Sequence, residues 1–142
     1  MSETSQYSSM PCLCIRMRRA AQKVTDFYDQ MLSSTGLTVN QFSLLVNISR
    51  MEGCGTGELA RKVGQEKSTL VRTLQPLIRN GLVKDRSSEG ERRRRLYLTP
   101  QGTATLTKAV PLWKKAQTAL AEKLGTTHTA LLEIFDGIDI LE

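Results

Sequence analysis

The side chains with the clearest chemical character lie on one face of a helical pattern that runs from about residue 67 to residue 80. Apolar residues recur there at the helical period and predict a buried stripe. The opposite face carries cations and short hydrogen-bonding side chains without a carboxylate: Lys67, Ser68, Thr69, Arg72, Thr73 and Gln75. Groups of these kinds bind phosphates and the edges of bases. This face is therefore the first candidate for a nucleic-acid contact.

A second group of cations follows where the spacing of apolar residues changes from about 3.6 to about 2. Val83 precedes a polar turn, and Leu96 and Leu98 alternate with polar residues after it, which predicts a β-hairpin. We expect the tip and the return strand of this hairpin to carry Arg92, Arg93, Arg94 and Arg95. Arg86, just after the first strand, adds a further cation. A shorter helical pattern over residues 56–64 comes before both surfaces. The order is that of a helix-turn-helix followed by a wing.

The charge of the chain is concentrated in this region. Residues 56–102 hold eleven Lys and Arg against five Asp and Glu, a difference of +6. The whole chain has the same formal charge, so the remainder is neutral. A localised basic surface on a helix-turn-helix is typical of a nucleic-acid binder. A run of arginines is otherwise often only a solvated loop, but this run lies where a wing would lie.

Further helical patterns must position these surfaces. They cover about residues 11–33, 38–51, 101–124 and 128–141. Thr38 and Gln41 have the spacing of a capping box, and Thr99 precedes a proline that suits the first helical position. Thr56 is expected to cap the short helix that ends at Gly64.

The first and last helices have wide apolar faces, with Met17 and Val24 on one and Phe135 and Ile138 on the other. A compact winged helix cannot cover both, so we expect a second copy of the chain to do so. The fold class is mainly α with a small β-hairpin wing. Residues 11–142 form a single domain, with a winged helix at about 38–100 and dimerisation helices at about 11–34 and 101–141. Residues 1–10 are polar and expected to be disordered.

Four pieces of the central stretch resemble the MarR family of bacterial transcription regulators: ELA at 58–60, STLVRTL at 68–74, GLV at 81–83 and LTPQG at 98–102. The resemblance implies a winged helix-turn-helix homodimer that binds pseudo-palindromic duplex DNA, most often as a repressor released by a signal. It also implies that the helix with Ser68, Thr69 and Arg72 enters the major groove. A wing arginine would enter the minor groove. Glu91 lies one residue nearer to the following helix than the family's usual Asp, so that arginine could be Arg92, Arg93 or Arg94.

Cys14 raises a second functional question. In the organic-hydroperoxide-sensing branch of this family, a reactive cysteine at the start of the first helix is followed by a tyrosine fourteen residues later. Cys14 and Tyr28 have this spacing, and the arginines at 16, 18 and 19 would favour a thiolate. The sensors' second tyrosine corresponds to Val39. A packed apolar cysteine and a redox sensor both remain open. Cys54, flanked by glycines, is expected to be exposed and is a weaker candidate.

Other sites find little support in the residues. Residues 64–69 have a lysine followed by Ser and Thr but lack the glycines of a phosphate-binding loop. Cys12, Cys14 and the lone His128 have poor spacing for zinc. We therefore expect no metal, no cofactor and no catalysis. Two alternatives to a DNA-binding regulator stay open: an RNA-binding or architectural winged helix, and a thiol peroxidase built on Cys14.

Composition also limits the location of the protein. No apolar run approaches the length of a membrane span, and the first residues lack the pattern of a signal peptide. Three cysteines are an odd number and do not suggest a disulfide framework. We expect a cytoplasmic protein without a membrane partner.

Overall fold

The computed structural model describes residues 11–141, apart from the side chain of Ile140, so the expected disorder of residues 1–10 lies outside the described part. The helices are α2 (Leu13–Leu32), α3 (Val39–Arg50), α4 (Thr56–Val63), α5 (Lys67–Arg79), α6 (Pro100–Leu124) and α7 (Thr127–Ile138). The strands are β1 (Val83–Asp85) and β2 (Leu96–Leu98), and two short 3-10 turns cover Ser33–Thr35 and Asp139–Leu141. The predicted fold class, a mainly helical winged helix-turn-helix, is confirmed.

The winged helix surrounds a core of leucine and isoleucine side chains. Those fully buried include Leu45, Ile48, Leu59, Leu70, Leu74, Leu77 and Leu96. They come from α3, α4, α5 and β2, and each stabilises the fold by about 1.5–3 kcal/mol on burial. The predicted capping box of α3 is present: the Thr38 hydroxyl accepts the Gln41 N–H, and the Gln41 side chain accepts the Thr38 N–H. The core thus positions α4 and α5, and the cap fixes the start of α3.

The start of α4 differs from the prediction. Thr56 does not cap this helix; it is the first helical residue and is buried, and the N-cap is Gly55. The physical reason is that the Gly55 carbonyl already accepts the Leu59 N–H, at 3.1 Å, so the helix begins one residue earlier than predicted. The Arg93 side chain packs directly on the Gly55 backbone, where an added Cβ would lie 2.9 Å from Arg93 Cγ. A side chain at the N-cap would therefore require the Arg93 side chain to shift.

The wing is a short antiparallel hairpin in which Val83 lies opposite Leu98 and Asp85 opposite Leu96. The loop before α4 joins it, because Cys54 forms an isolated bridge with Leu96. The arginines were expected at the tip and on the return strand. The expectation was wrong for the strand, since β2 begins at Leu96 and the four arginines precede it. Beyond this strand, the Arg95 carbonyl accepts the Arg86 N–H at 2.8 Å and the Asp85 carboxylate accepts the Arg95 N–H at 3.1 Å.

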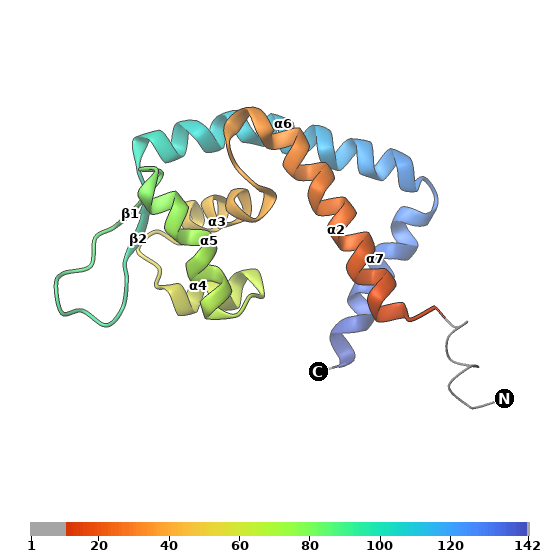
Figure 1. Ribbon diagram of the computed structural model, residues 1–142, viewed down its shortest axis with the longest axis horizontal. Helices are drawn as coiled ribbons and strands as arrows, with labels where there is room; N and C mark the ends of the chain where they lie inside the picture. Colours follow the sequence, from red (N-terminus) through yellow and green to blue (C-terminus); the bar gives the residue numbers. More distant parts are fainter. Residues whose placement is uncertain (1–10, 142) are drawn as a thin grey trace.

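The long helix α6 runs across the whole molecule and connects the wing to α7 (Figure 1). Its start is fixed as predicted: the Thr99 hydroxyl accepts the Gly102 N–H at 2.9 Å and donates to the Gly81 carbonyl. Gly102 is needed there, since an added Cβ would lie 2.0 Å from the Leu82 carbonyl oxygen. The helix is continuous through Pro111, as α5 is through Pro76.

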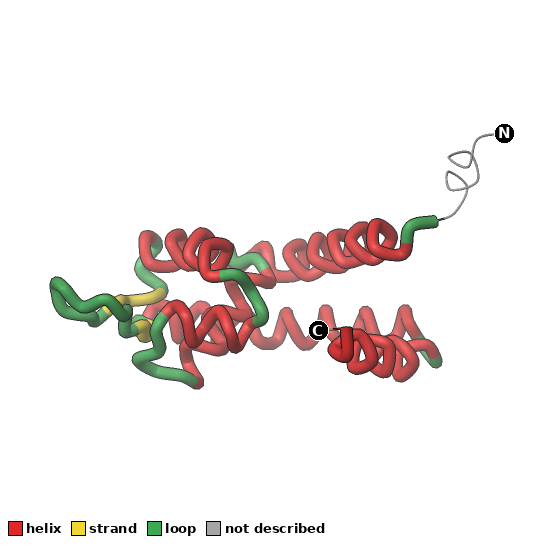
Figure 2. Tube along the Cα trace, turned by 90° about the horizontal axis from the view of Figure 1, so that it is seen from below, coloured by secondary structure: helices red, strands yellow, loops and turns green. Residues whose placement is uncertain are grey.

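The first and last helices project from the winged helix as separate arms. Figure 1 overlays α2 and α7, but Figure 2 shows them apart, with α2 above and α7 below. No residue of α7 up to Ile138 is buried, and Leu13 of α2 and Phe135 of α7 are 68% and 53% exposed. The chain thus leaves the apolar faces of both arms uncovered, as expected. No helix within residues 11–141 is long and apolar enough to span a membrane.

Candidate nucleic-acid interface and ligand groove

The predicted face of α5 is intact and faces solvent. Five of its six side chains are exposed, and Thr73 is half-buried. Leu70, Leu74 and Leu77 on the opposite face are fully buried, so the helix cannot rotate about its axis without losing core contacts. The sequence therefore predicted correctly which side of α5 is free to meet a ligand.

The wing arginines are distinguished by their partners. Arg93 forms an ion pair with Glu58 of α4. Arg94 lies 3.9 Å from Asp85, and Arg95 lies 3.5 Å from Glu91. Arg92 is exposed and has no acidic partner among residues 11–141.

Arg86 lies at the base of the wing, where its guanidinium stacks 4.7 Å from the centre of the Tyr97 ring. Its cation is thus held against the hairpin, while the Arg92 cation meets no carboxylate within residues 11–141. The arginines that the sequence presents as one run therefore have separate structural roles.

Asp85 fixes the base of the wing electrostatically. Burial alone would raise its pKa, but hydrogen bonds from the Ser87 and Arg95 N–H groups and the nearby Arg94 charge outweigh burial. The pKa of Asp85 is consequently below its ordinary value. The pKa of the exposed Glu91 is also lowered, chiefly because its carboxylate accepts the Ser88 N–H. Both carboxylates stay charged at neutral pH and hold the loop that presents the arginines.

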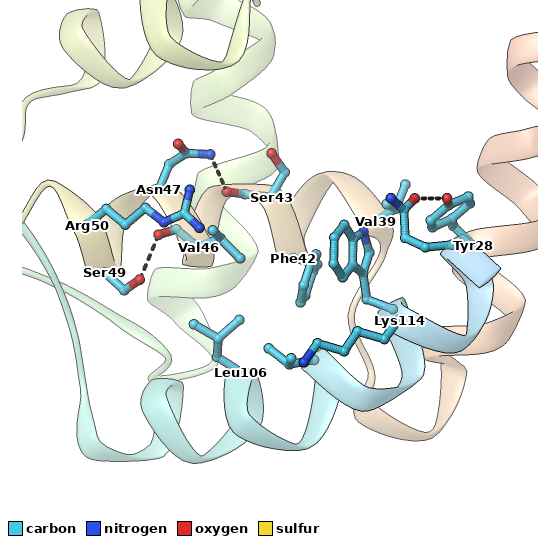
Figure 3. Close-up of a pocket in the computed structure, with 13 residues that line it drawn as sticks. Tyr28, Val39, Phe42, Ser43, Val46, Asn47, Ser49, Arg50, Leu106 and Lys114 are labelled. Atoms are coloured by element: carbon cyan, nitrogen blue, oxygen red, sulfur yellow. Dashed lines mark hydrogen bonds between the residues drawn. The ribbon is translucent and has the colours of Figure 1, made fainter. Parts of the chain in front are cut away.

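A groove of about 760 Å³ lies between α2, α3 and α6 (Figure 3). Arg50 lies at one end and Tyr28 at the other, with Phe42, Leu106 and Lys114 between them. Phe42 stacks on Trp113 with ring centres 5.7 Å apart. The thirteen lining residues include two cations and no carboxylate. Of these residues, sequence reasoning named only Tyr28 as a candidate site residue, because the lining comes from three helices and several of its residues read as ordinary core positions.

The candidate redox residues do not meet within one chain. Cys14 is exposed near the start of α2. Tyr28 is buried fourteen residues further along the same helix, about 21 Å away at the helical rise. The Tyr28 hydroxyl donates to the Gln117 side chain of α6. A contact between Cys14 and a Tyr28 hydroxyl would therefore require the tyrosine of a second copy.

The expectation for Cys54 was wrong. This side chain is 3% exposed, because the bridge to Leu96 draws its loop under the wing. Burial raises the pKa of the Cys54 thiol, although a backbone hydrogen bond and the Arg93 charge partly oppose it. A covered thiol with a raised pKa is a poor nucleophile. Cys54 is a core residue of the wing base.

Comparison with known proteins found a matching family and several similar solved structures. A model of the MarR family matches residues 35–94. The crystal structure of the M. tuberculosis transcriptional regulator MosR is 35% identical, with a TM-score of 0.78, and the match covers 92% of this chain and 95% of that one. MosR in complex with DNA is 34% identical, with a TM-score of 0.77 and coverages of 93% and 99%. The repressor CouR bound to p-coumaroyl-CoA is 28% identical, with a TM-score of 0.79 and coverages of 98% and 96%. Among curated proteins, no match was found.

Proposed function

This chain belongs to the MarR family of transcriptional regulators, and from that premise we propose that it binds duplex DNA sequence-specifically as a homodimer. The observation that carries the proposal is the convergence of α5 and the wing. Lys67, at the start of α5, and Arg92 and Arg93 of the wing line one small pocket, so the two basic surfaces border the same space. MosR and CouR have both been solved with DNA. A two-fold dimer would present two such surfaces to half-sites about one helical turn apart.

The two surfaces have different roles in this proposal. The exposed face of α5 enters the major groove, where Ser68, Thr69, Arg72 and Gln75 meet base edges and Lys67 and Thr73 meet the backbone. Arg86, Arg92, Arg93 and Arg94 contact phosphates and the adjacent minor groove. Arg92 is the first choice for the minor groove, because the other arginines of the run are held by carboxylates.

A second copy of this chain covers the arms in our proposal. The exposed apolar residues cluster on α2 and at the C-terminal end of the chain and include Leu13, Ile15, Met17, Leu132, Ile134 and Phe135. Apolar faces of this extent on two separate helices suit an intertwined interface that resembles a divided core. Cys14, on the same helix as Leu13 and Met17, would then lie at or beside that interface.

We propose repression that is released by a ligand in the groove between α2, α3 and α6. Its aromatic walls and its two cations favour a flat aromatic anion. The groove joins a dimerisation arm to the helix-turn-helix, so a ligand that fits only one arrangement would change the spacing of the two α5 helices. The related repressor CouR has been solved with p-coumaroyl-CoA, an aromatic thioester with phosphate charges.

Oxidation of Cys14 is the second candidate for the signal, because its thiol is exposed on an arm. A thiolate attacks the terminal oxygen of an organic hydroperoxide, the O–O bond breaks, and the products are a cysteine sulfenic acid and an alcohol. The added oxygen would disturb an apolar interface and thereby the DNA-binding geometry. Such sensing is stoichiometric. The family consists of regulators rather than enzymes, which argues against the peroxidase alternative.

The DNA proposal is tested against RNA at equal salt concentration. Fluorescence anisotropy with duplex DNA, duplex RNA and single strands of matched length gives the affinities. We expect the strongest binding to duplex DNA, in keeping with a cytoplasmic regulator of the chromosome. Equal or tighter binding to RNA would support the RNA-binding alternative and overturn the proposal.

A further inference from the structure

We propose that opposite charges on the two arms pair between two copies of the chain, α2 of one copy against α7 of its partner, and so select that partner. The inference rests on the proposed homodimer and deepens it, because apolar faces alone do not specify which arm meets which. It starts from the charge outside the basic region at 56–102. That remainder is neutral as a whole, but its two ends have opposite sign.

The arm α2 is cationic. Residues 11–25 hold four Lys and Arg and no Asp or Glu. All four are exposed: Arg16, Arg18, Arg19 and Lys23. Arg16, Arg19 and Lys23 are spaced at i, i+3 and i+7, so they form a row along one side of the helix. Leu13 lies three residues before this row and Phe27 four residues after it, which places the row beside the apolar face of α2.

The arm α7 is anionic. Residues 124–141 hold three Asp and Glu and no Lys or Arg, and the three are the exposed residues Glu133, Asp136 and Asp139. They are spaced at i, i+3 and i+6. Asp136 lies four residues after Leu132, and Asp139 lies four residues after Phe135, both of them exposed apolar residues. At the helical rise the cationic row is about 10 Å long and the anionic row about 9 Å, so the two rows match in length.

These charges form no ion pair within residues 11–141, where every ion pair involves a wing arginine. The two acids of α2 itself are engaged locally. Asp26 accepts a hydrogen bond from the Gln22 amide at 2.8 Å, and Asp29 accepts the Val39 N–H at 2.7 Å. Figure 2 shows α2 and α7 apart, so their opposite charges are available to a second copy.

The stability of the single helices does not explain where these charges lie. Arg16 is in the first turn of α2, where the helix dipole disfavours a cation and where the helix has no acidic residue. Asp136 is in the last turn of α7 and Asp139 is its C-cap, where the dipole disfavours an anion and where no basic residue compensates. A partner chain that neutralises these charges accounts for their positions.

The arrangement of charges determines which arms can meet. Contact of α2 with the partner's α2, or of α7 with the partner's α7, would bring like charges together at the edges of the apolar faces. Contact of α2 with the partner's α7 brings cations to anions, and two-fold symmetry repeats this contact. Charges at the rim of an interface contribute to the choice of partner more than to affinity. A related chain without this separation of charge would therefore form a weaker mixed dimer.

The test is a charge swap in the full chain. The first variant carries Arg16→Glu, Arg19→Glu and Lys23→Glu. The second variant carries Glu133→Lys, Asp136→Lys and Asp139→Lys. Sedimentation equilibrium gives the dimer Kd of each variant, and native mass spectrometry gives the composition of an equimolar mixture. We expect each variant alone to dimerise at least about a hundredfold more weakly than wild type, because like charges then meet in both contacts.

The mixture of the two variants should form a heterodimer with nearly the affinity of wild type, because both contacts between the arms again have opposite charges. A chain that carries all six substitutions should recover the homodimer for the same reason. If that chain recovers but the mixture does not, the arms pair within one copy and the inference is wrong. The substitutions suit the dipoles of their own helices, so loss of the dimer would not reflect melting of an arm. Variants that are insoluble alone are co-expressed, and the heterodimer then decides.

A matched control reverses three exposed cations of the winged helix and so changes the net charge as the first variant does: Lys62→Glu, Arg79→Glu and Lys84→Glu. It should dimerise like wild type. If wild type is a dimer and both arm variants dimerise as tightly, the charge pairing is wrong and the proposed homodimer stands. If the first variant stays dimeric but loses random duplex DNA, the α2 cations serve DNA and the inference also fails. A wild type that is monomeric at micromolar concentration would overturn the homodimer of the proposed function itself.

Discussion

Arg93 of the wing is ion-paired with Glu58 of the first turn of α4, and its side chain packs on the Gly55 backbone. This contact fastens the wing to the helix-turn-helix. Both side chains are partly exposed, at 62% and 37%, so the pair contributes at most about 1 kcal/mol to stability. Its importance is that it holds the Arg93 cation beside the first turn of α4.

The pair leads to the first prediction. Arg93→Ala should weaken binding to operator and random duplexes to a similar extent, by about tenfold, because a cation near the backbone is lost. Glu58→Gln should bind at least as tightly as wild type, because Arg93 keeps its charge and a carboxylate near the DNA is removed. Anisotropy on both duplexes measures this. If Glu58→Gln loses as much affinity as Arg93→Ala, the pair acts by ordering the wing and not through the charge of Arg93.

Arg72 gives the second prediction. It is exposed in the middle of α5, where it would reach base edges. Arg72→Ala should reduce the preference for operator over random DNA by about 1–3 kcal/mol at one base position, while binding to random DNA changes less. Selection from a random duplex pool with wild type and variant displays the change directly. An equal loss of affinity for both DNAs would exclude base recognition by Arg72.

The groove ligand gives the third prediction. Trp113 is the single tryptophan of the chain and lines the groove, so its fluorescence reports on binding there. Flat aromatic carboxylates should change this fluorescence and release DNA, whereas the corresponding uncharged amides should bind more weakly. Arg50→Gln should weaken the carboxylates roughly tenfold, and Arg79→Gln, outside the groove, should not. Equal binding of acid and amide to wild type would refute the role of the cations.

Cys14 gives the fourth prediction. Organic hydroperoxide should release the wild type from DNA, and a thiol reductant should restore binding. Cys14→Ser should bind DNA and ignore the oxidant, and Cys54→Ala should respond like wild type because that thiol is buried. Mobility-shift assays with and without oxidant are sufficient. If Cys14→Ser is released like wild type, or if wild type is never released, the cysteine has only a packing role.

The wing carboxylate gives the fifth prediction. The folded-state pKa of Asp85 lies below its ordinary value of 3.8, so the charged form is favoured by folding. Its stabilising contribution is fully present above that value and is lost as the pH falls through the lower folded-state pKa. Thermal unfolding followed by circular dichroism should therefore show wild type above Asp85→Asn at about pH 6, with the gap shrinking below about pH 3.8. A gap that is independent of pH would mean that the Asp85 charge does not stabilise the wing.

The regular parts of this fold could be predicted from sequence because local patterns determine them. The leucine stripe of α5, the capping box at Thr38 and the Thr99 cap each depend on residues a few positions apart. Cys54 was misjudged because Leu96, about forty positions later, pairs with its loop. Thr56 was misjudged because α4 begins one residue earlier, at the Gly55 N-cap on which Arg93 packs. The carboxylate partners that separate the arginines also became visible only in three dimensions, since Glu58 lies far from the wing in sequence.

The central claim is that two copies of this chain read one specific duplex. The most direct measurement selects bound sequences from a random duplex pool and then determines, by analytical ultracentrifugation and anisotropy, the stoichiometry and the affinity of the selected duplex. The account predicts a pseudo-palindromic sequence, two chains per duplex, and binding at least about a thousandfold tighter than to random DNA at the same salt concentration. No enriched sequence, or a single chain per duplex with equal affinity for random DNA, would contradict it.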